Sequence, residues 1–236
     1  MFDFKDKVIV VTGAAGNLGS AVVAAFLDAG GTVCGLDHRE GRLAEMFPDN
    51  ATNLHIYEGI DVTDQAAMLA LGERIHVEVG PVDVLVNTVG GFTMGERVDQ
   101  ISAKTWQNML DLNVHSLLNT SAAFVPGMLV AGRGKVVSIG SGASKKGSAK
   151  MGAYAAVKGA VLRLTESMAA ELKANNVQAN CVLPGTIDTP QNRQAMPGAD
   201  FKKWVTPGQV AQAILFLSSS AADGITGAAL PVFGSA

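Results

Sequence analysis

The chain has 236 residues, of which 48% are hydrophobic and 17% are charged, and its formal net charge is −3. These values are typical of a folded chain with a sizeable core, and they argue against a disordered or fibrous protein. The acidic balance also argues against a nucleic-acid-binding protein, because no basic surface is available to neutralise phosphates.

Seven short runs rich in β-branched residues alternate with longer, Ala-rich segments. They predict strands at 7–12, 32–37, 54–59, 82–87, 135–140, 177–183 and 229–233. Several runs are continuously apolar, as expected where helices cover both faces of a parallel sheet. The alternation therefore predicts a three-layer, doubly wound α/β fold with a mostly parallel, seven-stranded sheet. No linker or repeat interrupts it, so residues 1–236 are expected to form one domain.

The first strand leads into "TGAAGNLGS", which places Gly13, Gly16 and Gly19 before an amphipathic helix. Glycine permits a tight turn and lets a phosphate approach the backbone closely, and the start of the helix offers unpaired N–H groups to a pyrophosphate. The spacing is G-x-x-G-x-x-G, not the dinucleotide fingerprint G-x-G-x-x-G. A purely structural turn is the alternative.

Asp37 ends the second strand, where a carboxylate can accept hydrogen bonds from an adenosine ribose and would repel a 2′-phosphate. This position favours NAD over NADP, although Arg39 could offset part of the repulsion. A solvated acid at the end of a strand is the alternative. Asp61 follows the third strand, where it could meet the adenine or cap the helix that begins near Asp64.

Two helical patterns, 103–131 and 150–174, are longer than a helix that only covers one sheet face. The second contains "GAYAAVKGA", whose small residues permit close approach, either in tight packing or in a subunit contact. Tyr154 and Lys158 lie one turn apart and so share a helix face. An ammonium beside the phenol would lower its pKa from about 10 and suit Tyr154 to general acid–base catalysis. A solvated surface pair is the alternative.

Several motifs now form an ordered set: "TGAAGNLG", "DVTD", "LVNTVGG", "LNV", "SIGS", "YAAVK", "LPGTIDTP" and "ITGAAL". In order and approximate spacing, the set resembles the short-chain dehydrogenases/reductases over essentially the whole chain. The resemblance implies a Rossmann fold and an NAD(P)-dependent reaction that interconverts a carbonyl and a secondary alcohol. It also implies a homotetramer or homodimer, formed through the two long helices.

By position in these motifs, the resemblance assigns the catalytic residues to Asn113, Ser141, Tyr154 and Lys158. Ser138 competes with Ser141, but the family places this serine about a dozen residues before the tyrosine, which selects Ser141 (154 − 141 = 13). Lys158 would also hold the nicotinamide ribose, and Asn113 a water molecule. Together with Tyr154 and Lys158, the implied cofactor-binding residues are Gly13, Gly16, Asn17, Leu18, Gly19, Asp37, Asp61, Val62, Asn87, Gly90, Pro184, Gly185, Ile187 and Thr189.

The chain also departs from the family pattern. Asn17 stands where many members have glycine, and asparagine tolerates the left-handed conformation better than most residues. The usual "NNAG" reads "NTVGG", and the segment after "LPGTIDTP" is short, which predicts an abbreviated lid. That segment is similar to the one in dihydropteridine reductases, which usually lack the serine seen here as Ser141. An NADH-dependent pterin reductase and a non-catalytic NAD-binding regulator are therefore alternative functions.

The sequence also bears on localisation and on the substrate. The run "MFDFKDKVIVVTG" does not match a signal peptide, and no stretch approaches the roughly 20 apolar residues of a membrane-spanning helix. Cys34 and Cys181 lie in apolar runs, and neither they nor the four histidines show metal-ligand spacing. We therefore expect a cytoplasmic protein with no metal and no membrane partner. The expected pocket residues, near Phe92, Met94, Ser148 and Met196, do not select one carbonyl.

Overall fold

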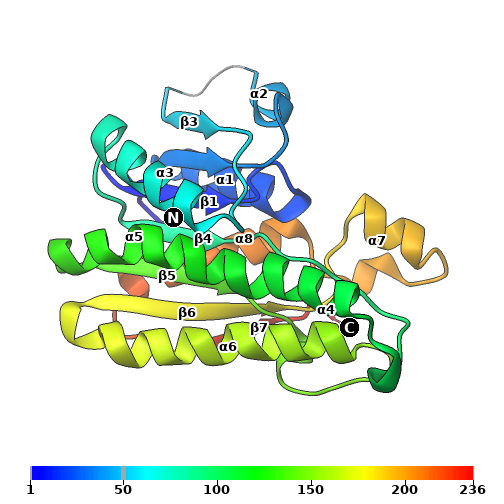
Figure 1. Cartoon of the computed structure of the whole chain (residues 1–236). Coiled ribbons are helices and arrows are strands. Elements are labelled where there is room, and N and C mark those ends of the chain that lie inside the picture. The colour runs from blue at the N-terminus through cyan, green and yellow to red at the C-terminus, as the bar shows by residue number, and fades with distance from the viewer. Residues whose placement is uncertain (1, 49–51, 236) are drawn as a thin grey trace.

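Seven strands form one sheet in the order β3-β2-β1-β4-β5-β6-β7, and every neighbouring pair is parallel (Figure 1). This computed structural model describes residues 2–48 and 52–235. The strands are β1 (Val8–Thr12), β2 (Thr32–Leu36), β3 (Leu54–Tyr57), β4 (Val84–Asn87), β5 (Gly134–Ile139), β6 (Val177–Pro184) and β7 (Ala229–Val232). All seven predicted strands are confirmed. Their β-branched residues pack well on a pleated sheet that helices cover on both faces.

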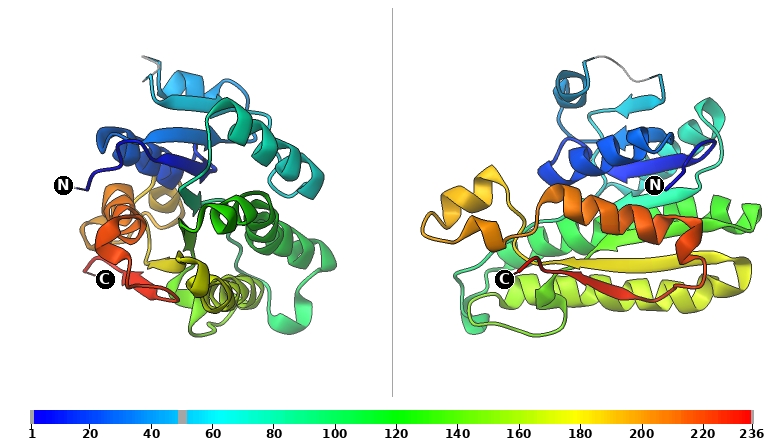
Figure 2. Two further views of the ribbon diagram at one scale, coloured as in Figure 1. Left: turned by 90° about the vertical axis from the view of Figure 1, so that its left-hand side faces the viewer. Right: turned by 180° about the vertical axis from the view of Figure 1, so that it is seen from behind.

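Helices cover both faces of the sheet, which confirms the predicted three layers (Figure 2). On one face lie α1 (Asn17–Asp28) and α8 (Pro207–Ser218), whose side chains share a core with Val11 and Val86. On the other lie α3 (Gln65–Glu78), α5 (Ser116–Ala131) and α6 (Gly152–Leu172). Alternate strand residues, such as Val10 and Leu85, pack toward α3 and α5. The sheet is therefore buried on both sides.

The predicted helix over 103–131 is interrupted. It consists of α4 (Ala103–Leu110), a π-helical turn (Asp111–His115) and α5. Such turns are rare, occur mostly as single turns within α-helices, and are frequent at functional sites. By length and composition alone, the whole run is also long and apolar enough to cross a membrane. The expectation that no such stretch exists was therefore wrong, but Phe124 and Met128 of α5 are buried in the core beside the sheet.

The second long helix is α6, which ends at Leu172 and is followed by a short 3-10 turn (Lys173–Asn175). Its first turns contact α4 through a small apolar cluster that includes Met109, Ala153 and Val157. A Cβ on Gly152 would lie 2.9 Å from Val98 Cγ2. The small residues at the start of α6 thus permit close packing within the chain.

The segment after β6 forms a lid, defined here as residues 186–205. It contains α7 (Pro190–Ala195) and a 3-10 turn (Phe201–Lys203), and Ile187 pairs with Val205 to close its base. The guanidinium of Arg193 lies 4.9 Å from the ring centroid of Phe201. The segment folds back on itself and projects beyond the sheet (Figure 1), and its shortness relative to the family stays a prediction.

Candidate active site

The candidate residues gather at the carboxyl ends of the strands, on the loops after β1, β2, β4, β5 and β6 and at the start of α6. This edge is where open α/β sheets bind ligands. The lid with α7 lies beside it (Figure 1). The topology therefore brings together residues that are far apart in the sequence.

Two glycines of the turn after β1 are each required for a different structural reason. Gly13 has a φ of +61°, a left-handed conformation that favours glycine. A Cβ on Gly19 would lie 2.1 Å from the Gly13 carbonyl oxygen. Gly16 is the N-cap of α1 and makes no side-chain cap, and the first turn of the helix has no acidic residue. The N–H groups at the start of α1 are thus suited to an anion such as a pyrophosphate.

Asn17 is the first residue of α1, and Leu18, the second, packs partly against the core. The explanation of Asn17 by a left-handed conformation was therefore wrong, because a first helical residue has a negative φ and Asn17 is not among the described positive-φ residues. Its side chain has a different contact: Nδ2 donates a 2.7 Å hydrogen bond to Oε1 of Gln191 in α7. The glycine turn and the lid are directly linked by this bond.

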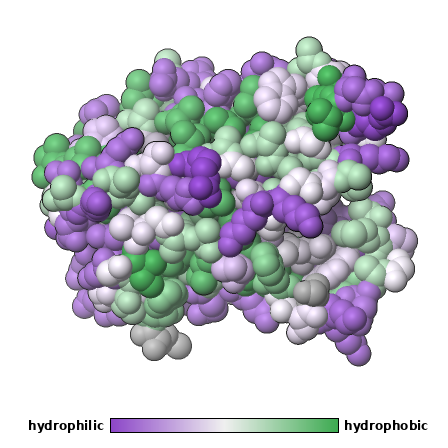
Figure 3. Space-filling view, turned by 90° about the horizontal axis from the view of Figure 1, so that it is seen from below, coloured by the Kyte–Doolittle hydropathy of each residue, from purple (hydrophilic) through white to green (hydrophobic). Residues whose placement is uncertain are grey.

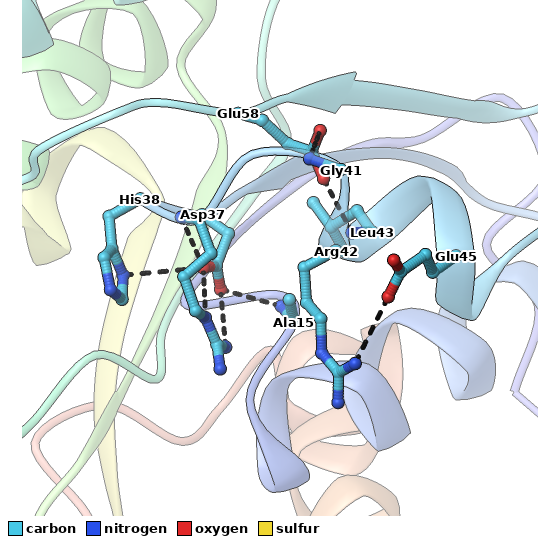
Figure 4. A network of polar contacts seen from close by, with 9 residues as sticks. Ala15, Asp37, His38, Gly41, Arg42, Leu43, Glu45 and Glu58 are labelled. Carbon is cyan, nitrogen blue, oxygen red and sulfur yellow. Dashed lines mark hydrogen bonds and ion pairs between the residues drawn. The ribbon is translucent and has the colours of Figure 1, made fainter.

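Asp37 follows β2 and is only 3% exposed, and Figure 4 shows it between Ala15 and His38. Its carboxylate accepts hydrogen bonds from the backbone N–H of Ala15 at 2.9 Å and from Nε of Arg39 at 3.0 Å. Burial acts to raise the pKa of Asp37, but the hydrogen bonds from Arg39 and Ala15 outweigh burial and hold that pKa below its ordinary value. Asp37 is therefore a carboxylate at neutral pH, and Arg39 is its ion-pair partner.

The loop after β2 is held from a second side. Glu58 accepts hydrogen bonds from the backbone N–H groups of Gly41 and Leu43, at 2.7 and 2.6 Å (Figure 4). These contacts anchor the start of α2 (Arg42–Met46). The position of Asp37 beside the glycine turn is thus fixed by the surrounding chain.

Asp61 and Val62 follow β3. The exposed Asp61 carboxylate accepts from the N–H and the hydroxyl of Thr63, at 2.8 and 2.7 Å. Asp64, not Asp61, is the N-cap of α3, so the helix-cap alternative for Asp61 was wrong. Val62 is buried, and its carbonyl accepts from Asn119 of α5. Asp61 thus remains at the edge of the site with its charge exposed to solvent.

Polar residues form a row across the ends of three strands: Thr12, Asn87 and Ser138 are register partners on β1, β4 and β5. The carbonyl of the Asn87 side chain accepts a 2.8 Å hydrogen bond from the hydroxyl of Thr120 on α5. Asn87 Nδ2 and Ser138 Oγ are buried without a partner among the described residues, and both residues line a small cavity beside Asn113. Ser138 thus lies inside the strand, as expected, and faces α5.

Asn113 lies in the π-helical turn and is 2% exposed. Its side chain donates to the carbonyls of Met109 and Gly91, at 2.9 and 3.3 Å, and accepts from the Gly91 N–H at 3.3 Å. A Cβ on Gly90 would lie 3.0 Å from both Asn113 Oδ1 and Lys158 Nζ. Gly90 is therefore needed to let these two side chains approach each other.

Ser141 lies just beyond β5, and Tyr154 in the first turn of α6. The Ser141 hydroxyl caps the 3-10 turn that follows it, accepting from the Ala143 N–H at 3.2 Å. Burial raises the pKa of Tyr154, and a hydrogen bond with Ser141 opposes the rise. The expectation of a pKa lowered by Lys158 is therefore wrong for this structure. Ser141, two residues beyond the end of β5, is the group that favours the phenolate.

Lys158 is buried, and its ammonium donates a 2.8 Å hydrogen bond to the Ile139 carbonyl. Burial lowers the pKa of Lys158 to about 8. An ammonium has three N–H donors, and the Ile139 carbonyl accepts one of them. The remaining donors suit the hydroxyls of a ribose.

The buried lysine predicts a pH dependence of stability. Between about pH 8 and 10.5, the folded protein has released the Lys158 proton while the unfolded chain still holds it. Stability should therefore rise with pH across this window, by on the order of 3 kcal/mol for the full shift. Urea unfolding of the wild type and of Lys158→Met at pH 7.5 and 9.5 measures the difference. An equal pH dependence in the two proteins would contradict the buried, charged lysine.

Hydrogen bonds hold the residues that follow β6 in place. The N–H of Gly185 bonds to the Val232 carbonyl at 2.9 Å, directly after Pro184. The carbonyl of Ile187 accepts from Asn192 Nδ2 at 2.8 Å. Thr189 is the N-cap of α7, and its hydroxyl accepts from the Asn192 N–H at 3.2 Å. That hydroxyl still has its proton to donate to a carboxamide.

Two residues near the site were not identified from the sequence. Gln191 contacts Asn17 across 174 positions, and Phe233, near the C-terminus, packs against Gly142 and Gly185. No local pattern marks either residue, because both contacts arise from the tertiary fold. Among residues 2–48 and 52–235, no group of three or more His, Cys, Asp or Glu side chains could hold a metal.

The arrangement can be compared with known proteins. The family model described as "short chain dehydrogenase" matches residues 7–199. A 2-(S)-hydroxypropyl-CoM dehydrogenase from Xanthobacter autotrophicus is 32% identical, with 98% of this chain and 96% of that protein covered. Two solved structures share the fold. A Burkholderia cenocepacia gluconate 5-dehydrogenase, in complex with NADP and tartrate, has a TM-score of 0.91, 27% identity and coverage of 99% and 96%. A Mycobacterium avium carveol dehydrogenase, in complex with NAD, has a TM-score of 0.90, 25% identity and coverage of 100% and 99%.

Proposed function

The chain belongs to the short-chain dehydrogenase family, and from this membership we propose how its residues carry out the family's reaction. It is an NAD(P)-dependent oxidoreductase that interconverts a carbonyl and a secondary alcohol. We assign the proton transfer to Tyr154, supported by Ser141, Lys158 and Asn113. The observation that carries this assignment is the convergence of these side chains at the strand ends, beside a glycine turn suited to a pyrophosphate.

The residues of the site fit a nicotinamide cofactor. The open N–H groups of α1 would hold the pyrophosphate, Asp37 the adenosine ribose, and Lys158 the nicotinamide ribose. Ile187 and Thr189 would contact the carboxamide. When bound, the reduced cofactor supplies the hydride.

The protein's own groups then handle the oxygen of the substrate. Ser141 and Tyr154 bind it through their hydroxyls, and Tyr154 gives it a proton during reduction or removes the proton during oxidation. Lys158 holds its ammonium against the Ile139 carbonyl and keeps its other donors for the cofactor ribose. Asn113 holds the π-helical turn against Gly91, so that this turn stays beside Lys158.

We further propose that NAD is preferred over NADP. The Asp37 carboxylate lies beside the glycine turn, where it suits two ribose hydroxyls and repels a 2′-phosphate. Arg39 neutralises part of this charge, so the preference should be modest.

Asp37→Asn tests the preference. The amide keeps an acceptor for the Ala15 N–H but loses the charge, so binding of NADH should weaken and binding of NADPH should strengthen. Arg39→Ala is the opposite change, because it leaves the Asp37 carboxylate without its ion-pair partner. This variant should weaken the binding of NADPH more than the binding of NADH. Fluorescence titrations with the two cofactors measure both variants. An unchanged ratio of dissociation constants in Asp37→Asn would remove Asp37 from the selectivity.

We also propose that the chain, as one domain, assembles as a homotetramer or homodimer through α4–α5 and α6. Trp106, Leu112 and Leu118 are large apolar residues exposed on the first of these helices, and such residues favour an interface when they cluster. The face over α6 mixes apolar and hydrophilic residues (Figure 3). Light scattering should therefore give two or four times the 24.3 kDa chain mass, and a monomer at micromolar concentration would contradict the proposal.

We propose a cytoplasmic location because both cysteine thiols are free and buried. Cys34 and Cys181 are free and buried, and burial raises their pKa values to about 12 and about 11. Such thiols are unreactive and suit a reducing compartment.

The reaction is tested by NADH oxidation with the purified protein and a panel of ketones, aldehydes, quinones and a quinonoid dihydropterin. NADPH is run in parallel. Turnover of carbonyl compounds is the expected result. Turnover confined to the dihydropterin would indicate a pterin reductase in place of a carbonyl reductase. NADH binding without any turnover would favour a non-catalytic regulator.

A further inference from the structure

The loop after β4 is pressed tightly against the site. A Cβ on Gly90 would lie 3.0 Å from Lys158 Nζ, and a Cβ on Gly91 would lie 2.8 Å from Leu112 Cδ1 and 2.9 Å from Met109 Cε. A side chain at either position would have to displace the ends of neighbouring side chains. The two glycines therefore let the backbone pass close to these side chains, and Phe92 follows directly.

Phe92 lies against the catalytic tyrosine. The two rings meet edge to face, with their centroids 4.9 Å apart and an interplanar angle of 78°. This geometry is one that aromatic pairs prefer. Phe92 nevertheless remains 59% exposed. A large apolar ring thus faces solvent directly beside the phenol that receives the substrate oxygen.

A second ring lies close to the residue that follows Ser141. A Cβ on Gly142, the residue after Ser141, would lie 3.6 Å from two atoms of the Phe233 ring. The backbone of Phe233 packs on Gly185, where a Cβ would lie 3.2 Å from the Phe233 Cα and carbonyl oxygen. Phe233 is 41% exposed. Ser141 is near enough to Tyr154 to lower its pKa, so both half-exposed rings lie near the pair of hydroxyls that would bind the substrate oxygen.

Three lysines of this region are exposed to solvent. Lys145, Lys146 and Lys150 are all exposed on the loop that carries Ser141. The surfaces that adjoin the two hydroxyls are therefore apolar and aromatic, whereas the cations are solvated. Such surfaces favour a flat or puckered hydrocarbon ring over a polyhydroxylated chain, whose hydroxyls would lose their hydrogen bonds to water.

On the basis of the proposed function, we propose that the substrate is a ring ketone or the corresponding ring alcohol, which packs against Phe92 and Phe233 while its oxygen meets Ser141 and Tyr154. In reduction, the carbonyl carbon accepts the hydride that reduced nicotinamide gives up, and a C–H bond forms. The oxygen takes the Tyr154 proton, which solvent then replaces. The products are a secondary ring alcohol and the oxidised cofactor.

The test compares cyclohexanone and 1-tetralone with the acyclic ketone 2-hexanone in NADH oxidation. The wild type should favour the ring ketones in kcat/KM by about tenfold or more. Phe92→Ala and Phe233→Ala should remove most of this preference, mainly through KM, and Phe92→Leu should restore part of it by refilling the apolar surface. NADH binding should be unchanged in all three variants, because Phe233 contacts Gly185 through its backbone, which alanine keeps, and Phe92 is on the substrate side of Tyr154.

Phe2→Ala is the matched control. Phe2 pairs with Phe216 at 6.2 Å, on the side of the sheet covered by α8, and its loss should leave the preference intact. Equal kcat/KM values for cyclohexanone and 2-hexanone would overturn the inference, and so would a preference that survives both alanine variants. Failure of the proposed function looks different, since the protein would then bind NADH and reduce neither class of ketone.

Discussion

Replacing Tyr154 by phenylalanine is expected to lower kcat by about 10²–10⁴-fold and to leave NADH binding almost unchanged. The change removes one oxygen atom, and the ring keeps its edge-to-face contact with Phe92. The proton donor is lost, whereas the glycine turn, Asp37 and Lys158 still hold the cofactor. Steady-state kinetics and a fluorescence titration with NADH measure the two quantities separately.

The chain offers a matched control, because Tyr57 is its only other tyrosine. The Tyr57 hydroxyl donates a 2.9 Å hydrogen bond to Glu78, at the edge of the sheet formed by β3. Tyr57→Phe should therefore cost about 1 kcal/mol of stability and leave kcat unchanged. A Tyr154→Phe protein that retains wild-type turnover would exclude Tyr154 as the proton donor.

The second large effect is expected at Gly19. A Cβ there would lie 2.1 Å from the Gly13 oxygen, 2.8 Å from the Gly13 carbonyl carbon and 2.9 Å from the Ala14 Cα. All three are backbone atoms, so no side chain can rotate away and the turn itself must open. Gly19→Ala should lower the free energy of unfolding by about 3 kcal/mol and abolish NADH binding.

Gly127→Ala is the control for this substitution. Gly127 lies within α5, and nothing lies within 4 Å of a Cβ built on it. Alanine there should raise the free energy of unfolding by about 1 kcal/mol, because it restricts the unfolded chain. Urea unfolding of both variants gives the comparison, and equal stability of the two would mean that the glycine turn tolerates a side chain.

The fold could be predicted from the sequence because its signals are local. Runs such as "KVIVVT" and "VDVLVN" are apolar enough to be buried on both faces, and the helices between them are periodic. The break at Asp111–His115 could not be predicted in this way. The side chain of Asn113 bonds to Gly91, on a loop 22 residues away, and a contact of this kind leaves no pattern in the helix itself.

In the candidate site, too, some features could be predicted from the sequence and others could not. The positions of Gly13, Asp37, Ser141 and Tyr154 could be predicted, because motifs fix them relative to strand ends. The pKa of Tyr154 could not, since it depends on how deeply the loops bury the phenol. The contact between Asn17 and Gln191 was also beyond prediction, because it joins the first helix to a lid 174 residues away in the sequence.

The hydrogen bond between Thr120 and Asn87 has a consequence for how α5 can sit on the sheet. A helix that packs only through aliphatic side chains can slide or rotate by one residue at small cost, because one apolar contact replaces another. Here a displacement would separate the Thr120 hydroxyl from the buried amide of Asn87, and an unpaired buried polar group costs about 1–3 kcal/mol. The bond therefore selects a single register for α5, and with it the position of Asn113, which is seven residues earlier in the same helical run.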